Sequence, residues 1–424
     1  MISKKNVTIS EGDGERPSCS PCQKGSRRCE WPYSTAPASS QNGLTLPLQT
    51  PFVSTESPEI ALQDIEVFRL FRHYTTSLAS WYDLNDRHRH FLDVVPVRAR
   101  QSPLLLSAIL AFSAVSLHKS DCAEYMDKAE FYHLESVRIL LEITKNIQTV
   151  VSNGEVLAAI CLLRSYEIIS LNLSSQSHLQ GCYSILSSHP IKLESGLVRA
   201  AFWNYLREDI TVALIEKRRL MIELSDEHYP KLENDDDYAN YVTVLLGQVI
   251  NQCFGNDVDP LELSRWNSLE QNLETWKNCL PTSFAPIIVK LPNEVGSAFP
   301  FIGALHPWHV AAWQYYQTAM IVLLLARPQL QNNTKMENIR HLSGLTRDLE
   351  NRTSEICALA LSSESQAVWI NAFGPIAFCG CWLRDQNQVS EVVQGVQDWG
   401  VQTGWPVKNI VQSLQTDKSV ADGF

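Results

Sequence analysis

The spacing of apolar side chains predicts that most of this chain is helical. From Ile60 onward, apolar residues recur mostly three and four positions apart, as they do over residues 65–78. This period places them along one face of a helix. Patterns typical of strands are scarce, and no repeat of fixed length is visible. The pattern therefore favours an all-α fold, an irregular multi-helix bundle rather than a regular solenoid.

Residues that start and stop helices divide this pattern into about a dozen helices. Ser102 precedes a proline that suits the first position of a helix over about 103–118, and Asp121 is placed to cap a helix over about 121–146. The same reasoning predicts further helices close to residues 155–169, 181–186, 196–220, 238–254, 261–280, 307–325, 336–362, 364–383 and 404–415.

One of these segments combines an apolar face with charged residues. Trp203, Leu206 and Ile210 lie three and four positions apart, so we expect them to pack in the core. Arg207 and Glu208 point elsewhere. For Arg207 we expect a structural ion pair with a carboxylate across the bundle, rather than a role in binding an effector.

Composition divides the chain into three regions. Residues 1–33 form a head that contains cysteine and arginine. Residues 34–59 are rich in Pro, Ser, Thr and Gln, which predicts a disordered, extended linker. Residues 60–424 form the helical body. Within that body, the acidic run over residues 233–238 is expected to be a solvated loop rather than a metal site.

The net charge limits how this chain could contact nucleic acid. A formal net charge of −11 over 424 residues argues against a broadly basic surface. The first fifty residues hold six basic and four acidic side chains, so the remaining residues carry −13. Any contact with DNA is therefore expected to be local.

Other features predict a protein inside the cell. The longest apolar stretches fall far short of the roughly 20 residues that cross a membrane, and the N-terminal residues lack the apolar core of a secretory signal. Most of the cysteines beyond Cys29 lie in apolar helical patterns, where free thiols act as small hydrophobes. We expect no membrane contact and no disulfide framework.

The head contains three cysteines at metal-ligand spacing. Cys19, Cys22 and Cys29 form a C-x2-C-x6-C triplet. Two thiolates in a tight turn and a third after a helical turn are able to grip one zinc ion. A closed tetrahedral zinc site takes four ligands. The triplet is therefore expected to share bridging thiolates with another triplet, to borrow a ligand, or to bind no metal.

This triplet resembles the second half of the fungal binuclear zinc cluster, in which two such triplets hold two zinc ions. Pro17 before the first cysteine, Lys24 and Gly25 in the spacer, and the exit at Trp31 match that half. The resemblance implies zinc as cofactor and Cys19, Cys22 and Cys29 as metal ligands. It also implies DNA as partner, with Lys24, Arg27 and Arg28 touching the phosphate backbone.

The first half of the cluster has no counterpart in this sequence. Residues 1–15 contain no cysteine, and the base-reading lysine of the family is missing with them. Two explanations stay open. Either the protein begins further upstream, or the module has decayed and the chain works through its helical body.

A second resemblance covers residues 68–327 and is to the fungal-specific transcription factor domain. The matching segments follow in the family's order at residues 74–83, 89–91, 95–96, 102–114, 178–181 and 202–210. The resemblance implies a nuclear regulator of RNA polymerase II transcription, possible control of a biosynthetic gene cluster, and regulation through a small-molecule effector, a homodimer or activator contacts. The alternative is a co-regulator, or an effector-binding interaction module, without DNA contact of its own.

The sequence contains no motif that is typical of an enzyme. His306 and His309 share a helix start, but no carboxylate or third histidine follows at ligand spacing. The basic run over residues 87–90 and the pair Cys379 and Cys381 match no catalytic or redox motif. Glycine-rich phosphate loops and nucleophile elbows do not occur. The sequence therefore predicts a protein that is not an enzyme.

Overall fold

The computed structural model describes residues 52–120, 125–144, 154–171, 175–188, 196–254, 261–328 and 335–416. The chain divides into two units, Met1–Pro51 and Phe52–Phe424, and every described residue lies in the second unit. The whole predicted head therefore lies outside the described residues, together with its metal ligands and its DNA-contacting residues. Asp121, the predicted helix cap, lies outside them as well.

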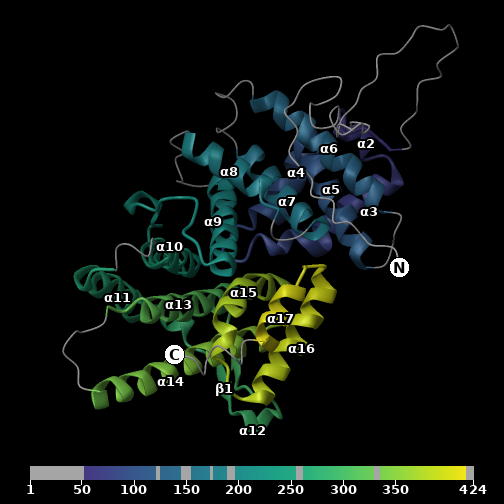
Figure 1. The fold of residues 1–424 in the computed structure, drawn as a ribbon. Coiled ribbons are helices and arrows are strands. Elements are labelled where there is room, and N and C mark those ends of the chain that lie inside the picture. Colours follow the sequence, from purple (N-terminus) through teal and green to yellow (C-terminus); the bar gives the residue numbers. More distant parts are fainter. Residues whose placement is uncertain are drawn as a thin grey trace, which may run out of the picture. The chain divides into compact units, whose positions relative to one another are not determined.

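The described residues form sixteen α-helices and one two-stranded hairpin, so the prediction of an all-α fold is confirmed (Figure 1). The helices are α2 (Pro58–Ala61), α3 (Ile65–His73), α4 (Val95–Ala99), α5 (Pro103–Ser120), α6 (Tyr125–Thr144), α7 (Glu155–Ser170), α8 (Ser177–Ser188), α9 (Gly196–Glu216), α10 (Asp235–Cys253), α11 (Leu263–Asn278), α12 (Pro292–Val295), α13 (Pro307–Leu325), α14 (Lys335–Leu361), α15 (Gln366–Cys379), α16 (Gln386–Thr403) and α17 (Lys408–Thr416). None of the described helices is long and apolar enough to cross a membrane.

Short turns of 3₁₀ and π helix connect several of these elements. They are η1 (Tyr74–Leu78), η2 (Ala79–Trp81), η3 (His90–Val94), η5 (Asp226–His228), η6 (Thr282–Phe284) and η7 (Gly380–Trp382). The hairpin pairs β1 (Ile288–Lys290) with β2 (Phe301–Gly303) in antiparallel register.

The predicted helix start at Ser102 is confirmed. Helix α5 begins at Pro103, and the Ser102 hydroxyl accepts a hydrogen bond from the backbone N–H of Leu105 at 3.4 Å. This bond satisfies one of the amide groups that the first turn of a helix leaves without a partner.

Helix α16 was not among the predicted helices. Its buried side chains nevertheless recur at helical spacing, at Val389, Val392, Val393, Val396 and Trp399. Valine and glycine are weak helix formers, so local propensity gives a poor signal here. Packing of the apolar face against the core supplies the stability that the local sequence lacks.

The acidic run over residues 233–238 is not a solvated loop, and that prediction was wrong. Helix α10 begins at Asp235, and Asp237 accepts a hydrogen bond from the backbone N–H of Asn234 at 3.0 Å. Asp236 and Asp237 are buried, and Asp237 pairs with Arg199 of α9 at 2.7 Å. Acidic side chains suit the first turn of a helix because the amide groups there carry partial positive charge.

The end of the predicted linker packs against α6. The ring of Phe52 lies 5.2 Å from that of Phe131. Glu135, buried on the same helix, accepts hydrogen bonds from the Ser54 hydroxyl at 2.8 Å and from the backbone N–H of Thr55 at 3.1 Å. Residues 52–59 therefore belong to the helical body, because apolar and polar contacts together fix them.

Two large apolar clusters meet along α9. One is built mainly from α3 to α8 and takes Ala201, Tyr205 and Val212 from α9. The other is built mainly from α10, α11 and α13 to α17 and includes Trp203 and Leu206. Figure 1 shows α9 running between the purple and blue helices and the green and yellow ones. The predicted core role of Trp203, Leu206 and Ile210 is confirmed.

Candidate functional site

The described residues contain no group of three or more His, Cys, Asp and Glu side chains arranged to hold a metal ion. The predicted ligands Cys19, Cys22 and Cys29 and the predicted DNA contacts Lys24, Arg27 and Arg28 lie outside the described residues. A candidate site in the described part therefore has to come from the helical body.

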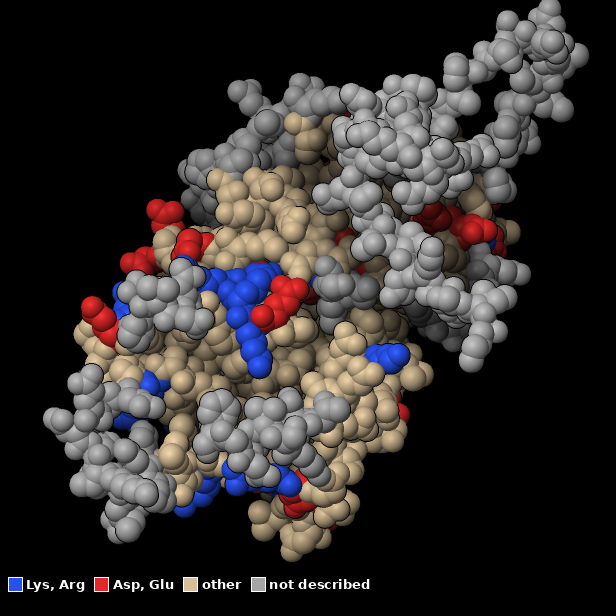
Figure 2. Space-filling model, viewed as in Figure 1, with Lys and Arg blue, Asp and Glu red and all other residues tan. Residues whose placement is uncertain are grey.

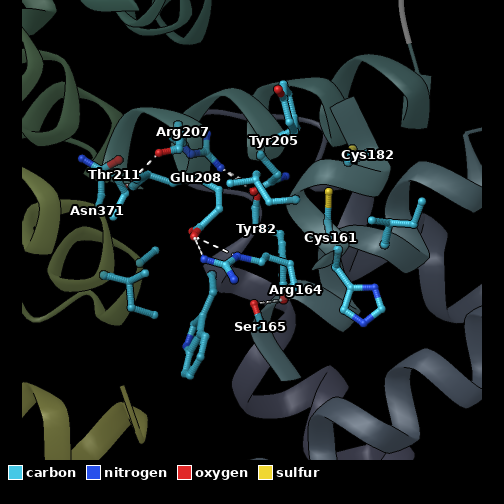
Figure 3. Close-up of a pocket in the computed structure, with 18 of the residues that line it drawn as sticks. Tyr82, Cys161, Arg164, Ser165, Cys182, Tyr205, Arg207, Glu208, Thr211 and Asn371 are labelled. Carbon is cyan, nitrogen blue, oxygen red and sulfur yellow. Dashed lines mark hydrogen bonds and ion pairs between the residues drawn. The ribbon is translucent and has the colours of Figure 1, made fainter. Parts of the chain in front are cut away.

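A cavity of about 80 Å³ lies beside α9, where the two apolar clusters meet (Figure 3). We call it the α9 cavity. Most of its polar lining comes from α7, α8, α9 and α15, and its apolar lining includes side chains of α7, α8 and α15. The residues used below are Arg164, Asn204, Arg207, Glu208, Thr211, Asn371 and Trp405, with Ile160, Leu179 and Ile370 on the apolar side.

Helix α9 supplies the central polar residues. These residues lie three or four positions apart along the helix, or next to each other, which puts them on one face. They are Asn204, Arg207, Glu208 and Thr211. The neighbouring face, with Trp203, packs in the core. One helix thus fixes both the core and the polar side of the cavity.

Arg164 is held by two carboxylates. Its Nε and Nη2 groups donate to Glu208 Oε1 at 3.1 and 2.9 Å, and its Nη1 group donates to Glu167 Oε2 at 2.9 Å. Glu167 also accepts from the hydroxyl of Ser175 and the backbone N–H of Ser177, each at 2.8 Å. Burial raises the pKa of Glu167, but these hydrogen bonds and the guanidinium outweigh it, so the pKa lies below its usual value.

Arg207 is buried without such a partner. Its Nη2 group donates to Asn204 Oδ1 at 2.6 Å and to the backbone carbonyl of Tyr82 at 3.3 Å. Within the described part of the chain, no carboxylate forms an ion pair with it. Burial lowers the pKa of Arg207. The predicted ion pair of Arg207 is therefore wrong, and Arg164 makes the contact across the bundle instead.

Two further buried polar groups at the cavity lack a partner. Asn371 Oδ1 and Trp405 Nε1 have no hydrogen-bond partner among the described residues. The Asn371 amide group itself donates to Gln314 Oε1 at 3.4 Å. Buried polar groups without partners are rare in proteins and cost free energy, so they indicate a place where another molecule could bind.

Tyr82 lines one side of the cavity, and its neighbour Asp83 is not among the lining residues. The Tyr82 hydroxyl donates to Ser165 Oγ at 2.6 Å, and its ring stacks on Phe91 with centroids 4.7 Å apart. Asp83 accepts hydrogen bonds from the backbone N–H groups of Phe91 and Leu92, both at 2.9 Å. Burial nevertheless raises the pKa of Asp83 to about 7.

Helix α8 is joined to α6 by two histidines. His133 Nε2 and His178 Nε2 lie 2.9 Å apart, so one ring donates a proton and the other accepts it. Burial and the neighbouring His178 lower the pKa of His133 to about 4, and burial also lowers the pKa of His178. Both rings are therefore neutral near pH 7, and they do not repel each other. The hydrogen bond between them holds His178, a lining residue of the cavity, against α6.

Two thiols line the same wall. Cys161 donates to the backbone carbonyl of Ala201 at 3.5 Å. A hydrogen bond with Cys161, followed by burial, raises the pKa of Cys182 well above its usual value. The raised pKa keeps the Cys182 thiol protonated, so it serves as apolar lining rather than as a nucleophile.

His309, at the start of α13, contacts a carboxylate from another helix, Asp235 of α10, which is not close to it in the sequence. His309 is fully buried, and its Nε2 atom lies 2.9 Å from Asp235 Oδ2 on α10. Burial lowers the pKa of His309 against the opposing effect of Asp235. This pair joins α13 to α10 and lies apart from the α9 cavity.

Charge on the surface is mixed. Figure 2 shows one face on which most of the described surface is uncharged and basic side chains lie close to acidic ones. In the part that the structure describes, Arg219 pairs with Glu223 and Arg89 pairs with Asp93 in this manner. A broad basic patch, which non-specific DNA binding requires, is not visible on the described surface of this face.

Comparison with known families identifies the helical body. The family model described as the fungal specific transcription factor domain matches residues 69–414. The chain belongs to this family. Helices α4 to α16 lie inside the match, as does α17 except for its last two residues. Every lining residue of the α9 cavity lies inside it as well.

One relative of this chain is the transcription activator AMTR1 of Alternaria alternata. It is 23% identical to this chain, and the alignment covers 64% of this chain and 45% of that protein. The chain thus spans less than half the length of this relative. No solved structure matches the chain.

The sequence pointed to α9 but not to its partners. The segment over residues 202–210 was singled out, and it carries Arg207 and Glu208. Arg164 was missed, although it and Glu167 are opposite charges three positions apart inside the apolar run of α7, which is a usable signal for a buried ion pair. Asn371 and Trp405 carry no signal of that kind, because they reach the cavity only through the packing of α15 and the segment after α16.

Proposed function

We propose that this protein is a fungal transcription factor that regulates RNA polymerase II transcription in the nucleus. Three observations support the proposal: the family of the helical body, its similarity to a transcription activator, and the cysteine triplet that precedes the family domain. The order of triplet, proline-rich segment and regulatory domain carries the proposal, because no single motif is as specific as this order.

The head would supply the DNA-binding function. Cys19, Cys22 and Cys29 would bind zinc as thiolates, and Lys24, Arg27 and Arg28 would contact DNA phosphates. The mixed charge of the helical body leaves this head as the local basic element. The helical body would serve regulation, through a small-molecule effector, a homodimer or contacts with activators.

A co-regulator without DNA contact is the second candidate. The observation that favours it is the number of thiolates, since three cysteines fill three of the four positions of a closed zinc site. In this case the helical body alone would carry the function, and zinc would be dispensable.

Zinc content and DNA binding of the full chain test the proposal. The zinc content per chain is measured on purified protein, and its affinity for genomic promoter fragments is titrated at two salt concentrations. We expect stoichiometric zinc and sequence-selective binding that weakens with salt, because phosphate contacts release counterions. The triple variant Cys19→Ser, Cys22→Ser, Cys29→Ser is expected to lose both the zinc and the DNA binding.

Cys279→Ser serves as the matched control, because this cysteine is free and exposed at the end of α11. It should keep the zinc content and the DNA affinity of the wild type. Equal zinc content in the wild type and the triple variant, with no selective DNA binding, would exclude the zinc-dependent factor and favour the co-regulator.

A further inference from the structure

Arg207 is a cation that the fold buries without an anion. It is 8% exposed, and burial is the main influence on its pKa. Both of its hydrogen bonds to described residues start from the same nitrogen, Nη2. The N–H groups of Nε and Nη1 donate to none of the described residues. These two nitrogens are not among the fully buried polar atoms, so they keep some access to solvent. A largely buried charge without an ion pair is still costly, so its retention has to be explained.

Arg164, in the same cavity, shows what a satisfied arginine looks like here. It is 4% exposed, and it donates to Glu167 and to Glu208. The carboxylate of Glu208 is thereby occupied, although it follows Arg207 directly in the sequence. Both arginines line the same cavity, and Arg207 forms no ion pair among the described residues. The carboxylates of Asp83 and Asp86 act on its pKa only from beyond ion-pair distance.

The remaining walls complement an organic anion. Trp405 Nε1 is a buried donor without a partner, and Asn371 Oδ1 is a buried acceptor without a partner. Each side chain is more than nine-tenths buried, and both line the α9 cavity. Ile160 and Leu179 provide an apolar surface beside them. A guanidinium fork and an indole N–H suit the two oxygens of a carboxylate.

The size of the cavity limits the ligand. Its volume of about 80 Å³ is roughly half that of the ~150 Å³ cavity that takes up benzene in an engineered protein. A carboxylate on a chain of a few carbon atoms therefore fits this volume, and the cavity is partly open to solvent. The unpaired acceptor of Asn371 favours a ligand with a hydroxyl or amino group beside the carboxylate.

We infer that the α9 cavity binds a short-chain hydroxy- or amino-carboxylate, with its carboxylate on Arg207 and Trp405 and its hydroxyl or amino group on Asn371. The ligand would touch side chains from both apolar clusters, because lining residues such as Cys161 and Trp405 belong to different ones. Binding would therefore stabilise their junction. That such binding regulates transcription rests on the proposed function. The binding of the ligand itself does not depend on it.

The full chain is titrated with L-lactate, propionate and chloride at matched ionic strength, by calorimetry and by thermal unfolding. We expect a saturable rise in unfolding temperature with L-lactate, a smaller rise with propionate, which lacks the hydroxyl, and no specific rise with chloride. Arg207→Gln is expected to weaken L-lactate binding by about tenfold or more, because it removes the charge-assisted hydrogen bonds.

The matched control is Arg219→Gln. This arginine is 48% exposed, pairs with Glu223 and does not line the cavity, so its variant should bind L-lactate as the wild type does. Without ligand, Arg207→Gln should unfold at the same temperature as the wild type or higher, because it removes a buried unpaired charge. A purely structural Arg207 would instead lower that temperature.

Asn371→Asp provides a second variant if Arg207→Gln fails to fold. A carboxylate at this position would add a negative charge to the cavity lining and should weaken L-lactate binding strongly, because it repels the carboxylate of the ligand. The inference is overturned if neither L-lactate nor propionate raises the unfolding temperature of the wild type beyond chloride, or if Arg207→Gln binds L-lactate unchanged. Zinc content and DNA affinity are measured without these ligands, so failure here is distinct from failure of the proposed function.

Discussion

At the scale of single residues, charge balance separates two arginines that share one cavity. Arg164 lies between Glu167 and Glu208, whereas Arg207 donates only to an amide oxygen and a backbone carbonyl among the described residues. Breaking a buried ion pair leaves a charge without a partner, whereas removing a charge that has no partner relieves a cost. The two side chains should therefore respond to substitution in opposite directions.

Arg164→Leu is expected to lower the free energy of unfolding by about 3–5 kcal/mol, because it leaves the buried carboxylate of Glu167 and the half-buried carboxylate of Glu208 without their cation. Glu167 keeps its bonds to Ser175 and Ser177. Unfolding in urea measures the change. The double variant Arg164→Leu, Glu208→Leu should recover a large part of the loss, and a single-variant cost below about 1 kcal/mol would contradict a structural ion pair.

The carboxyl group of Asp83 predicts a dependence of stability on pH. Burial raises its pKa to about 7, with the Asp86 carboxylate acting in the same direction and the hydrogen bonds from Phe91 and Leu92 and the charge of His90 opposing it. The folded chain therefore binds more protons than the unfolded chain between about pH 4 and pH 7. Its contribution to stability is present below that window and is lost as the pH rises through it.

Asp83→Asn is expected to remove this contribution, so the free energy of unfolding of the variant should fall less between pH 5 and pH 8 than that of the wild type. Urea unfolding at both pH values measures the difference. Asp93→Asn, which changes an exposed carboxylate that pairs with Arg89, serves as control and should follow the wild type. Parallel profiles for Asp83→Asn and the wild type would refute a raised pKa.

At the scale of helices, α9 and α15 approach closely at one point beside the cavity. A Cβ atom on Gly374 of α15 would lie 2.9 Å from the Cα atom of Thr211 on α9. Thr211 and Asn371 line the cavity from these two helices. The glycine therefore sets how closely the helices pack, and with it the width of the α9 cavity.

Gly374→Ala is expected to destabilise the protein by about 1–3 kcal/mol, because the added methyl group meets backbone that has to move. Alanine alone would favour a helix by up to about 1 kcal/mol. Gly344→Ala in α14, where a Cβ atom meets nothing within 4 Å, is the matched control and should be neutral or stabilising. Thermal unfolding compares the two variants, and equal behaviour would argue against a close approach.

At the scale of the whole helical body, the cavity lies where two apolar clusters meet. Helix α9 contributes side chains to both clusters, so the clusters do not separate without exposing one of its faces. Binding sites often occur at such junctions, because a small ligand can there stabilise one arrangement of two packed parts. A ligand in the α9 cavity would accordingly change the stability of the body as a unit.

The sequence by itself determined the helical class, the apolar face of α9 and the start of α5. These features depend on neighbours within one or two turns, and the chain encodes such neighbours as a period of three and four. The cysteine triplet was recognised by the spacing of its residues. The resemblance to the regulatory domain was recognised by the order of its matching segments along the chain. The family model then confirmed the second resemblance, the one to the fungal-specific transcription factor domain.

Only the tertiary structure decided which charges meet. The period of a helix sets the face on which Arg164, Arg207 or Asp237 lies, but not the residue that faces it from another helix. Glu208 pairs with Arg164, whereas Arg207 forms no ion pair with a carboxylate among the described residues. Asp237 pairs with Arg199, although the sequence around Asp237 predicts a loop. Burial and partners arise from packing between distant segments, and packing is what turned these side chains into a site.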